Sequence, residues 1–175
     1  MSALIFIVQT LLRLALGAVL IRLMMQLSRA DFRNQAAQFI VQVTNPLIVP
    51  LRRILPPMGK IDTASVVAVL LVAIVEVTIV FALSGIGVPP AFVWLRMVTL
   101  VIVRTALWTY FYAIFLYALL GLIVPGGYSP VQATLASICE PVLRPFRRVI
   151  PPISGFDLSP LWAGIVIQAL LILLS

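Results

Sequence analysis

Four apolar runs, each near the length that a helix needs to cross a bilayer, constrain the fold of this chain more than any other feature. They cover residues 3–27, 63–83, 91–124 and 158–174. About 20 apolar residues suffice for one transmembrane helix. Only 10% of the residues are charged, against about a quarter in an ordinary globular domain. These features predict an all-α membrane protein with about four transmembrane helices.

The last of these runs is the shortest. After Pro160 it holds about 15 residues, fewer than the ~20 of a typical span. We still expect it to be transmembrane, because its counterpart in the duplicated sequence described below, residues 63–83, is long enough to span.

Residue types exclude most catalytic and metal chemistry. The chain has no histidine, and Cys139 is its only cysteine. Histidine-based acid–base catalysis, an internal disulfide, a CxxC pair and a CxxCH haem site are therefore excluded, and Cys139 is expected to be a small packing residue. No pairing of a nucleophile with a base remains. The sequence predicts a protein that is not an enzyme and that binds no metal or cofactor.

The net charge of +7 comes mostly from arginines near the ends of the apolar runs. Such placement is typical of residues that set membrane topology and contact anionic phospholipid headgroups. The chain has no long basic stripe and no nucleic-acid-binding motif, so we expect no nucleic-acid partner.

A basic, proline-rich segment occurs twice, 95 residues apart. Residues 46–62 and 141–157 align without a gap, and seven of the 17 positions are identical. The identical pairs are Pro46/Pro141, Pro50/Pro145, Arg52/Arg147, Arg53/Arg148, Pro56/Pro151, Pro57/Pro152 and Asp62/Asp157. Such agreement indicates an internal duplication. The sequence therefore divides into two tandem repeats, residues 1–90 and 91–175.

Each repeat is expected to contain a span, a short amphipathic helix at the membrane interface, a proline-rich basic loop and a second span. Apolar residues at helical spacing predict the amphipathic helices within residues 28–45 and after Ser129-Pro130. Four prolines from Pro46 onwards predict that residues 45–62 do not form a continuous helix. Asp62, and either Asp157 or Ser159, are expected to cap the spans that follow, a role that suits the two aspartates better than catalysis.

Two spans per repeat place both basic loops on the same side of the membrane, so the repeats are parallel. The connection at residues 84–90 carries no charge, whereas both loops are basic. The positive-inside rule then predicts cytoplasmic loops and termini on the opposite side.

Three of the charged residues inside the spans are expected to lie well away from the headgroups. A charge at mid-bilayer costs about 2.5–3.5 kcal/mol on insertion scales, and Arg13, Glu76 and Arg104 are predicted to lie at similar depth. We expect Glu76 to pair with Arg13 or Arg104, either as a structural link or as part of a gate or a proton or cation relay. Arg22 faces the other side of its helix and is expected to extend to the headgroups.

The paired arginines of the loops have two interpretations, which are compatible. Arg52, Arg53, Arg147 and Arg148 are suited to binding anionic lipid headgroups, at about 1 kcal/mol for each basic residue near the surface. The repetition of the same side chains also fits a rigid, proline-fixed platform that a partner protein recognises.

The repeated NP…P-RR--PP…D pattern resembles the YggT family of small bacterial inner-membrane proteins, over nearly the whole chain. The resemblance implies a bacterial inner-membrane location with periplasmic termini, and a membrane accessory or assembly role. The family is linked to osmotic tolerance and cation uptake, to cell division and shape and, in plastids, to cofactor attachment on a cytochrome complex.

The predicted function is therefore that of a non-enzymatic multi-pass membrane protein that supports the assembly or organisation of other membrane components through its paired cytoplasmic loops. The alternative is a subunit or modulator of an ion or osmolyte transport system. The expected partners are the lipid bilayer, anionic phospholipid headgroups, an unidentified membrane protein and, in a homo-oligomer, further copies of the chain.

Overall fold

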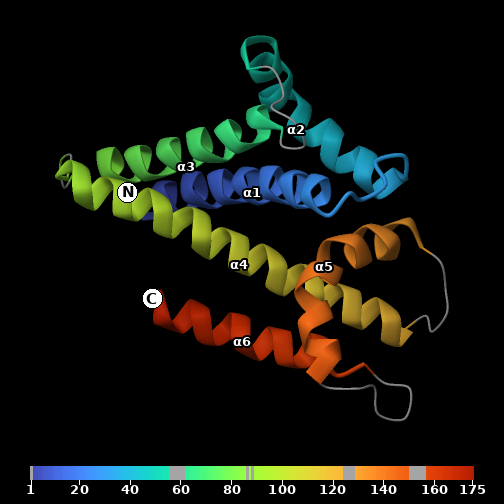
Figure 1. Ribbon diagram of the computed structural model, residues 1–175. Helices are drawn as coiled ribbons and strands as arrows, with labels where there is room; N and C mark the ends of the chain where they lie inside the picture. Colours follow the sequence, from blue (N-terminus) through green and yellow to red (C-terminus); the bar gives the residue numbers. More distant parts are fainter. Residues whose placement is uncertain (1, 56–61, 86, 88, 124–128, 150–156) are drawn as a thin grey trace. The chain divides into compact units, whose positions relative to one another are not determined.

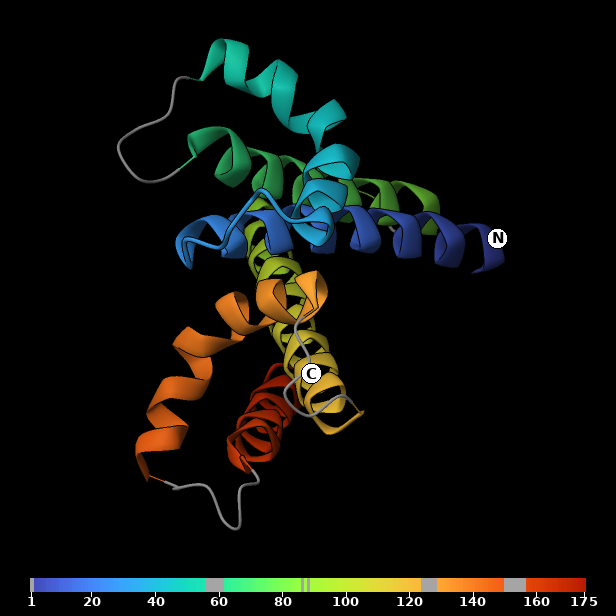
Figure 2. The same ribbon diagram turned by 90° about the vertical axis from the view of Figure 1, so that its right-hand side faces the viewer.

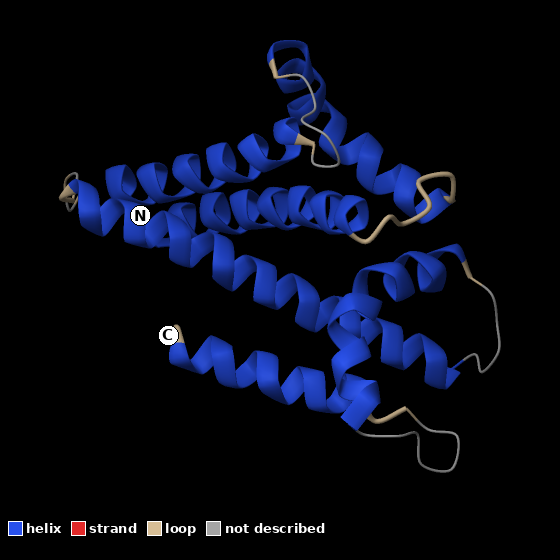
Figure 3. Ribbon diagram, viewed as in Figure 1, coloured by secondary structure: helices blue, strands red, loops and turns tan. Residues whose placement is uncertain are grey.

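Six helices make up the regular structure of the part of the chain that is described (Figure 1). The computed structural model describes residues 2–55, 62–85, 87, 89–123, 129–149 and 157–175. Within these ranges no strand occurs (Figure 3). The helices are α1 (Ser2–Leu27), α2 (Gln35–Ile54), α3 (Thr63–Ser84), α4 (Ala91–Ile123), α5 (Pro130–Val149) and α6 (Ser159–Leu173). The prediction of an all-α membrane-type fold is confirmed.

Three helices, α1, α3 and α4, are long and apolar enough to cross a membrane. α6 is as apolar but has 15 residues. At 1.5 Å per residue it extends about 22 Å, which is less than the ~30 Å hydrocarbon core of a typical bilayer. Length thus supports three of the four expected spans and leaves the fourth, α6, as a prediction.

Helices α2 and α5 are longer than the sequence predicted. They continue through Pro46 and Pro50 and through Pro141 and Pro145, so the expectation that the amphipathic helix ends by residue 45 and a loop follows was wrong. Residues 45–62 still do not form one continuous helix, as predicted, because α2 ends at Ile54. Each proline removes one N–H bond to the residue four positions earlier, and a spacing of four puts both losses on one side of the helix. The helix therefore bends rather than ends, and Figure 2 shows the bend in α5.

The second proline pair of each repeat, Pro56-Pro57 and Pro151-Pro152, lies outside the described residues.

The chain forms two compact units. Unit 1 comprises Met1–Leu23 and Ile40–Ala106, and unit 2 comprises Met24–Phe39 and Leu107–Ser175. Helices α1, α2 and α4 each contribute to both units. The repeat boundary at residue 90 remains a prediction, because a compact unit and a duplicated sequence need not share their ends.

The two units bury equivalent positions. The core of unit 2 joins α4, α5 and α6, and a shift of 95 residues converts its members into residues of unit 1 that are also buried. The pairs are Ile114/Val19, Cys139/Thr44, Leu143/Ile48, Ala163/Ala68, Ile167/Val72 and Leu171/Glu76. The duplication is therefore visible in the packing of the helices as well as in the sequence.

Candidate functional site

The first contact of the candidate site joins Arg52 and Asp62. Arg52 lies in the last turn of α2, and Asp62 directly precedes α3. The Nη2 and Nε atoms of Arg52 donate hydrogen bonds to Oδ2 of Asp62 at 2.5 and 3.2 Å. The Ser65 hydroxyl donates to the same oxygen at 2.8 Å. This pair, which we call the first clamp, joins the end of α2 to the start of α3.

The same contact recurs 95 residues later. Nε of Arg147 donates to Oδ2 of Asp157 at 2.8 Å, which joins the end of α5 to the start of α6. Arg147 also donates to Glu140 at 2.5 Å and to the Tyr117 hydroxyl at 3.4 Å. The backbone N–H of Ser159 donates to Oδ1 of Asp157 at 2.9 Å. We call the Arg147–Asp157 pair the second clamp.

The main side-chain contact of Asp62 and of Asp157 is with an arginine, rather than with the first turn of a helix. Asp62 occupies the N-cap position of α3, as predicted, but its carboxylate makes no capping bond. The N-cap position of α6 is Leu158, not Asp157 or Ser159 as predicted, but Oδ1 of Asp157 still accepts the backbone N–H of Ser159, the first residue of α6. Hydrogen bonds between ionised partners are roughly twice as strong as neutral ones, and each carboxylate is accordingly directed to the guanidinium.

The hydrogen bonds of the two clamps favour the charged forms of Asp62, Asp157 and Arg147. Burial raises the pKa of Asp62, but the hydrogen bonds from Arg52 and Ser65 outweigh it and leave the pKa below its usual range. Burial likewise raises the pKa of Asp157, while the bonds from Ser159 and Arg147 bring it below the usual range. The pKa of Arg147 lies above its usual value, because the bonds to Asp157 and Tyr117 outweigh the effect of burial.

The second arginine of each pair has a different environment. Arg53 and Arg148 are exposed, and neither has an ionic partner among the described residues. Neighbouring residues on a helix lie about 100° apart, so an arginine that follows a clamped one is directed elsewhere. The structure thus separates four arginines that the sequence treated as equivalent. The first prolines of the motif, Pro46, Pro50, Pro141 and Pro145, are exposed beside them.

The neighbours of the two clamps differ in charge. Arg22 of α1 is buried and donates through Nη1 to Thr44 at 2.7 Å and to Asn45 at 3.0 Å. The prediction that Arg22 extends to the headgroups was wrong, because α2 offers it three oxygens. At the equivalent positions of the second repeat stand Tyr117 in place of Arg22 and Glu140 in place of Asn45.

Two of the charged residues that the sequence places inside the spans, Arg13 and Glu76, form an ion pair in unit 1. Nε of Arg13 on α1 lies 2.9 Å from Oε1 of Glu76 on α3. The side chain of Glu76 is 1% exposed and that of Arg13 is 55% exposed. Arg13 is thus bound to Glu76, as one of the two predicted pairings has it, and Arg104 lies half-buried on α4. The counterparts of Arg13 and Glu76 are Trp108 and Leu171, so the second repeat has apolar residues at these positions.

Known proteins have sequences similar to this one. The family model CCB3/YggT matches residues 1–83 and 97–175. An uncharacterized protein of Pseudomonas aeruginosa is 40% identical over 169 residues, which cover 95% of this chain and 85% of the relative. The uncharacterized protein YggT of Escherichia coli K12 is 33% identical over 161 residues, 92% of this chain and 83% of the relative. No solved structure matches.

A chloroplast protein is similar over a shorter stretch. YlmG homolog protein 2 of Arabidopsis thaliana is 40% identical over 45 residues, which cover 26% of this chain and 18% of that protein.

The ion pair between α1 and α3 can be tested by installing the residues of the second repeat. Glu76→Leu leaves Arg13 charged without its carboxylate, and should lower stability in detergent by about 1.5–3 kcal/mol. The double variant Arg13→Trp/Glu76→Leu copies the Trp108/Leu171 pair and should recover part of that loss in thermal unfolding. Losses that simply add in the double variant would argue against a coupled pair.

The first clamp predicts a loss of stability in acid. Because the pKa of Asp62 is lower in the folded protein than the ~3.9 of an unfolded aspartate, its contribution is complete above about pH 4 and disappears as the pH falls through the folded pKa. Asp62→Asn should lower stability at pH 7 by roughly 1–3 kcal/mol and flatten the dependence on pH.

Asp157→Asn is the matched control for this experiment. The Asp157 side chain is 37% exposed against 4% for Asp62, so its substitution should cost less. Equal acid sensitivity of the wild type and Asp62→Asn in detergent melting curves would contradict the assignment.

Proposed function

This chain belongs to the CCB3/YggT family, and on that premise we propose that it is a non-enzymatic multi-pass membrane protein that supports the assembly or organisation of other membrane components. It acts through the exposed ends of α2 and α5, each of which carries one clamped and one free arginine in its last turn. We place it in a bacterial inner membrane with these ends in the cytoplasm.

The observation that carries this proposal is the repetition of one arrangement at two places. In both repeats the first arginine binds the aspartate ten residues later, and the second arginine is exposed. Lipid anchoring alone needs only positive charge near the surface. A clamp that fixes the last turn of the helix is an additional feature, and it holds the neighbouring free arginine in a defined place.

The free arginines are suited to two kinds of partner at once. Each contributes about 1 kcal/mol of attraction to anionic headgroups near the surface. Each also presents a planar set of donors that matches a carboxylate or a phosphate in two-point contact. The bilayer would orient each helix end, and a membrane protein could then bind the free arginine at either end.

A second candidate function is a subunit or modulator of an ion or osmolyte transport system. Its support is the buried Glu76, whose Oε2 atom has no hydrogen-bond partner among the described residues. The apolar counterparts Trp108 and Leu171 weaken it, because the second repeat offers no matching polar pair at that depth. A structural link between α1 and α3 accounts for the pair more simply.

Lysine substitutions separate the roles of the paired arginines. Arg52→Lys/Arg147→Lys should lower stability, because an ammonium group cannot replace the Nε and Nη donors of the clamps. Arg53→Lys/Arg148→Lys should fold and insert normally. It should nevertheless fail to complement fully, under osmotic stress, a bacterial strain that lacks its own family member.

The alanine variant provides the reference for that comparison. If Arg53→Lys/Arg148→Lys complements fully and Arg53→Ala/Arg148→Ala does not, only electrostatic anchoring remains. Full complementation by the alanine variant, at equal membrane level, would refute a role for the free arginines.

The proposed orientation is tested by cysteine accessibility in a Cys139→Ala background. Lys60→Cys and Ser154→Cys should be protected from a membrane-impermeant thiol reagent in intact cells, whereas Ser84→Cys, at the exposed end of α3, should react. Ser84 suits this test better than Gly87, whose φ of +81° strains any other residue. Labelling at residues 60 and 154 with protection at residue 84 would mean the reverse orientation.

A further inference from the structure

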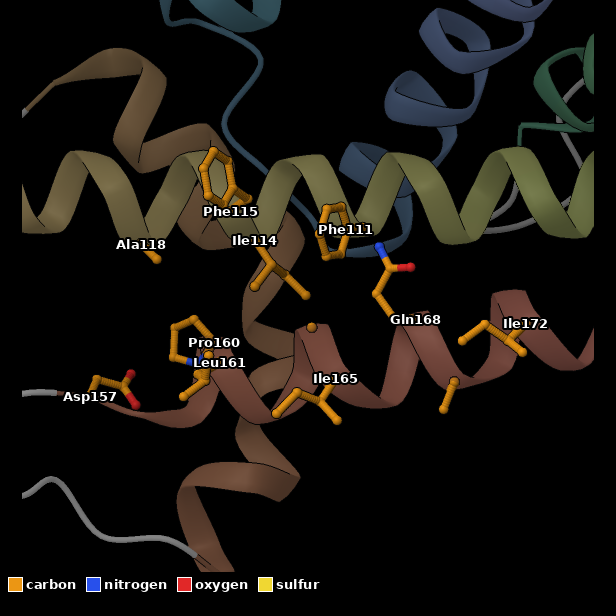
Figure 4. Close-up of a pocket in the computed structure, with 12 residues that line it drawn as sticks. Phe111, Ile114, Phe115, Ala118, Asp157, Pro160, Leu161, Ile165, Gln168 and Ile172 are labelled. Carbon is orange, nitrogen blue, oxygen red and sulfur yellow. The ribbon is translucent and has the colours of Figure 1, made fainter.

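An apolar groove in unit 2 is left open between α4 and α6 (Figure 4). Its volume is about 640 Å³. Phe111 and Phe115 line it from α4, and Gly164, Gln168 and Ile172 line it from α6. α4 is long enough to span a membrane and α6 is expected to do so, which would place the groove at the depth of the lipid, with Asp157 of the second clamp lining its end.

The equivalent face of unit 1 is closed. Along α3, every fourth residue of one stripe is buried, and the counterparts on α6 line the groove. The pairs are Ser65/Pro160, Val69/Gly164, Ala73/Gln168 and Val77/Ile172. Val77 is 5% exposed and Ile172 is 71% exposed. The same fold therefore buries this face in one repeat and leaves it uncovered in the other.

Gln168 shows what kind of occupant the groove takes. It lies nine residues after the start of α6, about 13 Å along the helix axis. Its amide points toward the groove (Figure 4), and it makes no hydrogen bond to any described residue. An amide without partners in a lipid environment costs several kcal/mol, and an acyl chain offers it none. In unit 1 the same position is Ala73, which needs no partner.

We propose that the groove is the contact surface of a homodimer, in which α6 of a second copy lies against α6 and α4 of the first. A two-fold axis sets identical surfaces against each other. Two Gln168 amides that meet at such an axis satisfy one another, because each is both a donor and an acceptor. Gly164 and Ala169 beside Gln168 allow the close approach that membrane helices need. This proposal is independent of the proposed function, since it uses none of the arginines.

Cysteine cross-linking in membranes tests the contact surface directly. In a Cys139→Ala background, Ile165→Cys and Ile172→Cys face the groove and keep Gln168 in place. Val166→Cys and Leu170→Cys are exposed on the other side of α6 and serve as matched controls. Oxidation should give disulfide-linked dimers at one or both groove positions and little at the controls.

Subunit counting in liposomes tests the role of Gln168. At high dilution in lipid, Gln168→Ala should weaken dimerisation roughly three- to fifteenfold, as expected for one interhelical hydrogen bond in a membrane. Val166→Ala should leave it unchanged.

Three outcomes would overturn the proposal. One is a monomer at every protein density in the membrane, and another is equal cross-linking at groove and control positions. The third is a monomer that retains a bound phospholipid in native mass spectrometry, lost when Ala118→Phe fills the groove, which would assign the groove to an acyl chain.

Discussion

The bond between an arginine at the end of one helix and an aspartate at the start of the next determines how each repeat is built. A basic helix and an apolar helix are joined there by eight residues in the first repeat and nine in the second, and both connections include a double proline. Proline residues alone limit the path of such a connection but do not set where the next helix begins. The clamp sets that starting point, because it binds the last turn of α2 to Asp62, directly before α3, and the last turn of α5 to Asp157, two residues before α6. The proline bends upstream then determine the direction in which the clamped end points.

The two repeats keep this arrangement while their polar groups have been exchanged for apolar ones elsewhere. Glu76 and Leu171 are both buried at the same position, and so are Thr44 and Cys139. A buried carboxylate requires a cation, which Arg13 supplies, whereas Leu171 requires only packing. The duplicated fold therefore tolerates either solution inside the membrane, provided that each polar group is matched. Gln168 is a polar residue for which the described residues of unit 2 supply no hydrogen-bond partner.

Sequence patterns were sufficient for the features that depend on composition and spacing. Apolar length identified α1, α3 and α4, and the shift of 95 residues identified the duplication. The depth of Glu76 limited its partner to two arginines. Sequence was not sufficient where two local rules competed. Proline was expected to end a helix, yet prolines four residues apart bend α2 and α5 without ending them, because the hydrogen bonds on the other side of the helix persist. Nor could it distinguish Arg52 from Arg53, since the distinction depends on which of them faces Asp62.

The charges around the clamps imply that the two helix ends are not equivalent as binding surfaces. Arg22 and Arg52 both lower the pKa of Asp62 electrostatically, so two cations surround a single carboxylate at the first clamp. At the second clamp Arg147 is bound by both Glu140 and Asp157, so one cation lies between two carboxylates. The exposed Arg144, four residues before Arg148 on α5, adds a second cation there, so the charges around Arg148 are near balance. A free arginine beside an excess of positive charge attracts an anion more strongly than one in balanced surroundings, and surface interactions of this kind act within about 8–10 Å at physiological salt. Arg53 is thus the stronger candidate for a headgroup phosphate. Arg148, next to the carboxylates of the second clamp, fits a partner that presents both signs of charge.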